Sequence, residues 1–319
     1  MVHPAGLLDR SAGCFYTPIN HRSLLNFAIC HKIHEFSCFR WLYSLKIIIF
    51  GDVRSVIMKP CSKVLKPVAS VVLAAAISGC AGSVNKASET KIEAIEIVHD
   101  EAAALFEGST DSLNINMKIE WPVGGVEEEA LERMQRDITA HLLGEEYHTF
   151  DIDYAIRQYC DRSIEFYRET NSEWAESEGF EEDMHYTLQW MGYIEGGFLP
   201  EYRNMISYVT LYGGYSGGAH GMDAKAAITF DIDTGKRVTE ADLFKPGYED
   251  RLTQSLRANL LLSVKDVDML FETEIDSSGN FYVSDEGVTY IYGRYEVGPY
   301  VMGIVEVNIP WDEISDILK

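Results

Sequence analysis

The chain of 319 residues is long enough to bury a substantial core, and 46% of its residues are hydrophobic. Residues 1–80 contain 9 Lys and Arg against 3 Asp and Glu, so residues 81–319 contain 18 basic and 47 acidic residues, a net charge of −29. A surface this acidic repels nucleic acids and anionic lipids, and no nucleic-acid partner is expected. It either keeps the protein soluble or steers a basic partner towards it.

A lipoprotein signal peptide is predicted over residues 58–79. It has a lysine-containing start, and its apolar run at 68–77 is too short to span a bilayer. The positions Ile77-Ser78-Gly79-Cys80 resemble a bacterial lipobox. The resemblance implies that Cys80 is acylated, and several acyl chains anchor a protein firmly because each buried CH₂ contributes about 0.8 kcal/mol. Ala81, in place of an aspartate, implies an outer-membrane lipoprotein of the bacterial cell envelope.

Residues 1–57 precede this signal, although a signal peptide belongs at the amino terminus. We therefore interpret 1–57 as an upstream extension and Met58 as the true start. Residues 80–92 are small and polar, which is typical of a tether, here a lipidated one. Cys160 is the one cysteine after Cys80, so no disulfide framework is expected and Cys160 should pack as a small apolar residue.

Residues 93–200 are predicted to form an N-terminal α+β companion domain. Residues 92–106 have a mixed composition that favours neither a helix nor a strand. Hydrophobic periodicity predicts, in chain order, a strand over 112–121, helices over 126–142 and 153–170, and a hairpin of 184–192 with 193–202 around Gly196 and Gly197.

Residues 201–319 are predicted to form a C-terminal α+β domain that is richer in strands. The expected elements are strands over 205–212 and 224–232, a helical turn capped by Thr239, a helix over 250–264, strands over 281–283, 288–292 and 303–309, and a closing helix over 310–318.

A glycine-rich segment, residues 215–221, separates two of these strands. Glycine adopts positive φ at little steric cost, so one interpretation is a hairpin turn whose glycines serve geometry alone. The other is a backbone-lined ligand surface, with tyrosine rings from this segment and from the loop 294–300; for the tyrosines, packing in the core or at a strand edge is the alternative. The candidate ligand-binding residues are Tyr212, Tyr215, Gly217, Gly218, His220, Tyr295, Glu296 and Tyr300.

The C-terminal part resembles a known family. The order and spacing of five segments, 215–221, 233–236, 239–246, 281–287 and 292–309, are similar to those of the extracytoplasmic RsiV-type domain. That domain forms the C-terminal half of lysozyme-sensing anti-sigma factors and accompanies the deacetylase domain of PdaC-type enzymes. The resemblance covers about residues 206–319, so 201–319 is assigned as the RsiV-type domain. It implies an α+β fold with antiparallel sheets backed by helices, in two packed subdomains. No sigma-binding helix or deacetylase domain is recognisable, so the resemblance transfers the module and neither activity.

Two functions are compatible with these features. The first is a non-catalytic binding module on a lipid tether, whose ligand is an envelope glycan or a basic protein such as lysozyme; tyrosine offers both ring area and a hydroxyl for this purpose. The alternative is a cell-wall hydrolase or deacetylase-like enzyme with His220 and Glu296 as an acid/base pair. No nucleophile elbow appears around a serine. No metal is expected, because the histidines after Cys80 lack zinc-motif spacing, and no cofactor is expected; these histidines are His99, His141, His148, His185 and His220.

Overall fold

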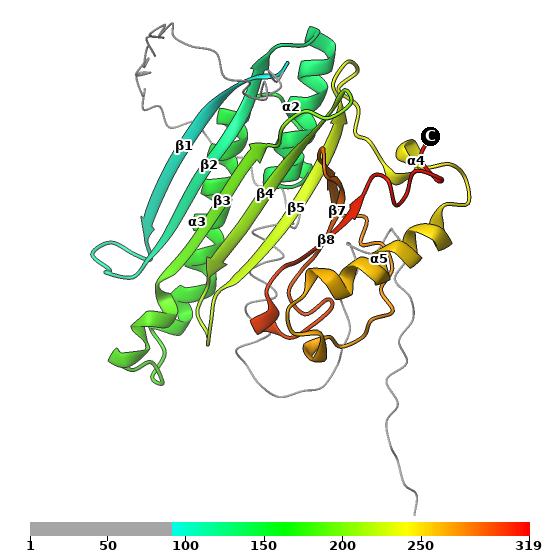
Figure 1. Ribbon diagram of the computed structural model, residues 1–319. Helices are drawn as coiled ribbons and strands as arrows, with labels where there is room; N and C mark the ends of the chain where they lie inside the picture. The colour runs from blue at the N-terminus through cyan, green and yellow to red at the C-terminus, as the bar shows by residue number, and fades with distance from the viewer. Residues whose placement is uncertain (1–90) are drawn as a thin grey trace, which may run out of the picture. The chain divides into compact units, whose positions relative to one another are not determined.

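The computed structural model describes residues 91–319 (Figure 1). The upstream extension 1–57, the signal peptide 58–79 and the lipidation site Cys80 lie outside the described residues and stay predictions. Five strands form the first sheet in the order β1-β2-β3-β4-β5, with bounds Glu93–Ala104, Ser112–Gly124, Trp190–Phe198, Met205–Tyr215 and Met222–Asp231.

Two long helices, α2 (Glu128–Leu143) and α3 (Ile152–Ala175), connect β2 to β3 and cover one face of this sheet (Figure 1). Because they form a crossover, β2 and β3 run parallel, whereas the other neighbouring pairs of the sheet are antiparallel. The predicted α+β class is confirmed, with this one parallel pair among otherwise antiparallel strands.

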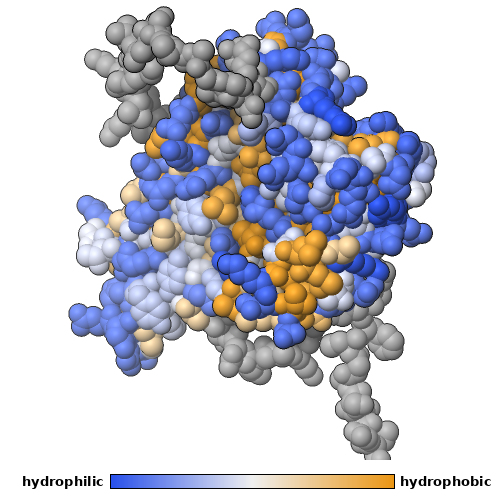
Figure 2. All heavy atoms as spheres, viewed as in Figure 1, coloured by the Kyte–Doolittle hydropathy of each residue, from blue (hydrophilic) through white to orange (hydrophobic). Residues whose placement is uncertain are grey.

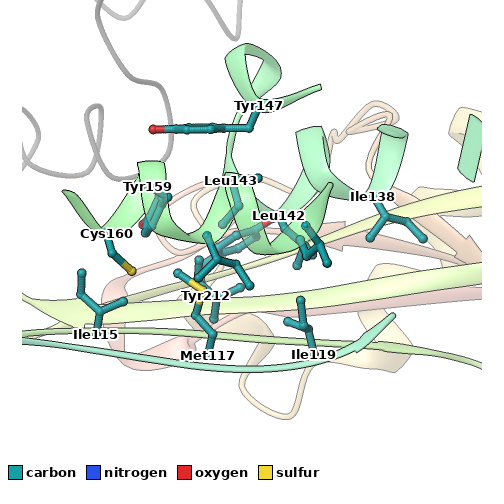
Figure 3. Packing of buried hydrophobic residues seen from close by; sticks show 14 of the residues in the cluster. Ile115, Met117, Ile119, Ile138, Leu142, Leu143, Tyr147, Tyr159, Cys160 and Tyr212 are labelled. Atoms are coloured by element: carbon teal, nitrogen blue, oxygen red, sulfur yellow. The ribbon is translucent and has the colours of Figure 1, made fainter. Parts of the chain in front are cut away.

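The first core lies between these helices and the sheet. Alternate side chains of β2, including Ile115, Met117 and Ile119, are buried against Ile138 of α2 and Tyr159 of α3 (Figure 3). The predicted alternation at 112–121 and the two predicted helices are thereby confirmed, because the apolar face of the strand packs against the apolar faces of the helices. Each fully buried side chain of this kind contributes about 1.5–3 kcal/mol.

The second sheet contains β6 (Phe281–Val283), β7 (Gly287–Tyr292) and β8 (Val305–Pro310), all antiparallel. Helix α5 (Glu249–Ser263) packs on it through Leu252, Leu256 and Leu260. The short helix α4 (Glu240–Leu243) begins with the predicted cap, a capping box of Thr239 and Asp242. Four 3₁₀ helices are also described, namely η1 (Glu145–Tyr147), η2 (Glu182–Leu188), η3 (Val267–Met269) and η4 (Tyr300–Met302).

Polar contacts join the second sheet to the face of β4 and β5 that points away from α2 and α3. The Ser207 hydroxyl bonds to Thr229 at 2.9 Å and accepts the Val283 N–H at 3.0 Å. The Asn280 amide accepts the Ala227 N–H and donates to the Lys225 carbonyl, both at 2.9 Å, and so covers part of the free edge of β5.

Four expectations for the chain differ from the structure. The hairpin around Gly196 and Gly197 is wrong: both glycines lie inside β3, where a Cβ on Gly196 would come within 2.5 Å of the Tyr208 hydroxyl. The closing helix is also wrong, since residues 311–317 form turns. Ile92, placed at the end of the tether, is buried in the first core. The first sheet also continues across the predicted domain division at 200–201, because β3 pairs with β4.

Candidate functional site

The glycine-rich loop 216–221 joins β4 to β5 as a hairpin connection. Gly217 and Gly218 have φ of 82° and 100°, values that side-chain-bearing residues rarely adopt. A Cβ on Gly217 would also lie 2.8 Å from the Thr187 carbonyl oxygen of η2. The Tyr215 hydroxyl donates to the Gly218 carbonyl at 2.8 Å, so this tyrosine closes its own loop.

Tyr212 lies in the first core and not on the surface. It belongs to the residues of β4 that face the helices, it is 9% exposed, and its hydroxyl donates to the His141 carbonyl of α2. Burial raises the pKa of Tyr212. Its ring therefore offers no accessible face for a ligand.

An ion pair and an aromatic ring connect the start of β5 with the loop 293–302. The Arg294 guanidinium donates hydrogen bonds to both carboxylate oxygens of Asp223, with Nη2 2.9 Å from Oδ2. Arg294 Nη1 donates to the Tyr300 carbonyl at 2.5 Å, and the guanidinium carbon lies 4.2 Å from the centre of the Tyr300 ring. The hydrogen bond to Asp223 raises the pKa of Arg294 further, so its charge is permanent.

Tyr300 also reaches the glycine-rich loop. Its hydroxyl donates to the Gly221 carbonyl at 2.7 Å, and its ring centre lies 4.2 Å from that of His220. The His220 imidazole is exposed and donates from Nδ1 to the Gly221 carbonyl at 2.9 Å. The structure thus brings two of the predicted residues, His220 and Tyr300, into direct contact.

Tyr295 extends this group towards solvent. It is 52% exposed and its ring centre lies 5.9 Å from that of Tyr300. Its φ of 66° is unusual for a residue with a large side chain and costs about 1 kcal/mol or more. We call Tyr295, Tyr300, His220 and Arg294 the aromatic cluster.

Glu296 belongs to the same loop but makes a local contact. Its carboxylate accepts the Gly293 N–H at 2.7 Å. Desolvation raises the pKa of this carboxyl, and the Gly293 hydrogen bond opposes that shift. His220 and Glu296 are joined by neither a hydrogen bond nor an ion pair in the described part of the chain, so the predicted acid/base pair is not assembled.

Two important residues, Asp223 and Arg294, were not among the sequence-based candidates. They are 71 positions apart, and no local pattern marks a charge pair at that separation. The Tyr193 side chain of β3 lies against Gly213, beside this pair. Its pKa is raised mainly by desolvation and to a smaller extent by the negative charge of Asp223.

A small cavity lies beneath α3, against the ends of β3 and β4. Its volume is about 40 Å³, room for a few water molecules, and its lining includes Phe166, Trp190, Tyr212 and Ser216. The Ser216 hydroxyl is buried without a hydrogen-bond partner among the described residues. The cavity is too small for a sugar ring, so it is not a candidate site for a glycan.

Neither a metal centre nor a membrane span appears in the part of the chain that the structure describes. Over residues 91–319, no three His, Cys, Asp or Glu side chains are grouped so that they could hold a metal ion. Among the helices of the same residues, none combines the length and the apolar character that crossing a bilayer requires.

Comparison with known proteins gives one family. The model of the family described as "Protein of unknown function (DUF3298)" matches residues 241–312. A crystal structure of a DUF3298 family member from Bacteroides fragilis is similar with a TM-score of 0.65 and 25% identity, over 72% of this chain and 94% of that one. A DUF3298 family protein from Pseudomonas aeruginosa covers the same shares at 17% identity, with a TM-score of 0.48. The search of curated proteins gave no match. Residues 241–312 therefore contain a DUF3298 domain, and the similar Bacteroides fragilis structure is a member of that family.

Proposed function

We propose that this protein is a lipid-anchored, non-catalytic binding module of the bacterial cell envelope, and that its ligand is an envelope glycan. The aromatic cluster is the single observation that supports this function most strongly. It presents the exposed Tyr295 ring and the exposed His220 imidazole, which are supported from below by Arg294 and Tyr300.

The chemistry of the cluster suits a neutral polyhydroxylated ligand. Tyrosine rings offer flat apolar area against which a sugar ring packs, and the hydroxyl of Tyr295 and the free ring nitrogen of His220 can hydrogen-bond sugar hydroxyls. Asp223 neutralises Arg294, so the strongest local charge is already paired. Side chains that are already held in place by long-range contacts lose little conformational entropy when a ligand binds.

The cellular setting rests on the sequence. The lipobox-like Ile77-Ser78-Gly79-Cys80 supports acylation of Cys80, and Ala81 supports an outer-membrane lipoprotein. The similarity of residues 206–319 to the extracytoplasmic RsiV-type domain supports the same envelope location. We treat the DUF3298 domain at 241–312 as part of that RsiV-type domain.

A second candidate ligand is a basic protein such as lysozyme. The net charge of −29 over residues 81–319 favours it, since opposite charge speeds encounter. Apolar side chains also gather in a patch on the face shown in Figure 2. Leu262, Phe271 and Val301 are 83%, 60% and 77% exposed. Exposed apolar area of this kind is typical of protein-binding surfaces. Calorimetric titration with lysozyme at low and at physiological salt tests this candidate; absence of heat at both would remove it.

The glycan proposal is tested by co-sedimentation of the native lipoprotein with purified cell-wall sacculi. We expect saturable retention by the wild type, lost in Tyr295→Ala and kept in Tyr154→Ala. Tyr154 on α3 is a matched control because it is also 52% exposed and lies outside the cluster. Equal retention of the two variants would refute the assigned site. Release of soluble glycan fragments would instead favour a hydrolase.

A further inference from the structure

The point where the chain enters the fold is held in place at one end of the first sheet. Gly125, with φ of 89°, lies so close to the Lys91 carbonyl that a Cβ on Gly125 would collide with it. Ile92, which follows Lys91, is buried. The Lys91 ammonium donates to the Asn204 side chain at 3.1 Å, and the Lys91 N–H donates to Glu201 at 3.4 Å. The backbone contact fixes the entry point more firmly than these exposed polar contacts, which are individually weak.

The turn that receives Lys91 carries a stack of three side chains. Tyr202 and Met205 exchange two backbone hydrogen bonds of 2.9 Å, which leaves Arg203 and Asn204 as a two-residue turn. Both turn residues have positive φ, 50° and 67°, a conformation usually left to Asn and Gly. This turn places the Arg203 guanidinium 5.1 Å from the Tyr202 ring and 5.6 Å from the Trp311 ring.

The two rings are themselves stacked, with centres 5.1 Å apart and an interplanar angle of 15°. Trp311 is fixed by donating its indole N–H to the Ser284 carbonyl at 2.8 Å, and Arg203 is exposed. Among the ion pairs of the described residues, none involves Arg203, so its charge is available for an anion. We call Tyr202, Trp311 and Arg203 the entry stack.

The entry stack and the aromatic cluster lie at opposite ends of β4 and β5. Met205 pairs with Asp231 at the first end, and Gly214 pairs with Met222 at the second, next to the glycine-rich loop. Strand β4 has 11 residues, so it spans about 34 Å. Only ten residues, 81–90, separate Cys80 from Lys91, and eleven residue steps reach at most about 40 Å.

We propose that the entry stack contacts the lipid headgroups of the membrane that holds the Cys80 anchor, with Arg203 on a phosphate and the two rings in the interfacial layer. The proposal rests on the lipid anchor of the proposed function. Guanidinium groups match phosphate oxygens, and Trp and Tyr favour the boundary between headgroups and acyl chains. The stack is next to the tether, so it is the surface that a short tether brings to the bilayer first. The aromatic cluster then lies at the far end of β4, at most about 34 Å further from the membrane.

The test uses the acylated wild-type protein reconstituted in phosphatidylcholine vesicles that contain lipids brominated near the headgroup. After Cys80 the chain has four tryptophans, Trp121, Trp174, Trp190 and Trp311. We expect a component of the emission to be quenched in the wild type and to be lost in Trp311→Phe. Arg203→Glu should reduce the quenched component.

Lys265→Glu is the matched control, because it makes the same charge change at an exposed residue just after α5. It should leave the quenching as in the wild type. Equal quenching in the wild type and Trp311→Phe, or an equal loss in the two charge variants, would overturn the headgroup contact while leaving glycan binding untouched. A mass spectrum showing unmodified Cys80 would instead overturn both this contact and the lipid anchor of the proposed function.

Discussion

The ion pair between Arg294 and Asp223 should be a major link between the glycine-rich loop region and the second sheet. Arg294→Met removes two hydrogen bonds to Asp223, one to the Tyr300 carbonyl, and the contact with the Tyr300 ring. The side chains of the pair are 17% and 26% exposed. Exposed pairs contribute about 0–1 kcal/mol, and breaking a fully buried pair costs about 3–5 kcal/mol. For this half-buried pair we expect a loss of about 2 kcal/mol.

Urea unfolding of the wild type, Arg294→Met, Asp223→Asn and the double variant measures this loss and its origin. The double variant should lose less than the sum of the single variants, with a coupling of about 1 kcal/mol or more. Arg257→Met is the control, because its carboxylate partners Glu274 and Asp276 are 70% and 81% exposed, and it should cost less than about 1 kcal/mol. Equal losses in Arg294→Met and Arg257→Met, or additive losses in the cycle, would refute the reasoning.

Three further predictions concern single residues. Burial raises the pKa of the Cys160 thiol to about 12, so a maleimide at pH 7 should label Cys160 in urea and not in the folded protein. Burial, with Arg237 nearby, lowers the pKa of His141 to about 3, so the unfolded chain takes up this proton first as the pH falls below about 6.5. Wild-type stability should therefore fall by about 2 kcal/mol from pH 6.5 to pH 5 through this residue, and unfolding curves of His141→Gln should lack that loss. Gly217→Ala should be more destabilising in thermal unfolding than Gly218→Ala, because both have positive φ but only Gly217 faces a backbone oxygen, at 2.8 Å.

The elements that could be predicted from the sequence are those with one buried face, because the spacing of their hydrophobic residues indicates that face. Strand β2 alternates because one side packs on α2 and α3, and α2 repeats every four residues for the same reason. Thr239 begins α4 through a capping box, which is a local interaction and therefore readable in the sequence.

Strands β1 and β3 could not be predicted, and the causes differ. Strand β1 is an edge strand whose side chains are mostly exposed or half-buried, so alternation is weak. In β3, two glycines that look like a turn instead make room for neighbours: Gly196 for the Tyr208 hydroxyl, and Gly197 for the Glu120 carboxylate. Both neighbours lie on other strands, β4 and β2, so no local pattern shows them.

The candidate site shows the same division between local and distant information. His220 and Tyr300 could be named from their loops, and the structure brings them into contact. Tyr212 lies near the end of β4, close to the glycine-rich loop, but the register of the strand places its side chain in the core. Arg294 and Asp223, which orient the cluster, depend on a pairing across 71 positions that only the folded chain reveals.

Binding without catalysis is tested most directly by calorimetric titration of soluble peptidoglycan chains into the wild-type protein, with mass analysis of the glycan afterwards. We expect a saturable heat of binding that disappears in Tyr295→Ala, and a glycan of unchanged mass. Absence of heat with the wild type, or a glycan that has been shortened or deacetylated, would contradict a module that binds through the aromatic cluster without catalysis.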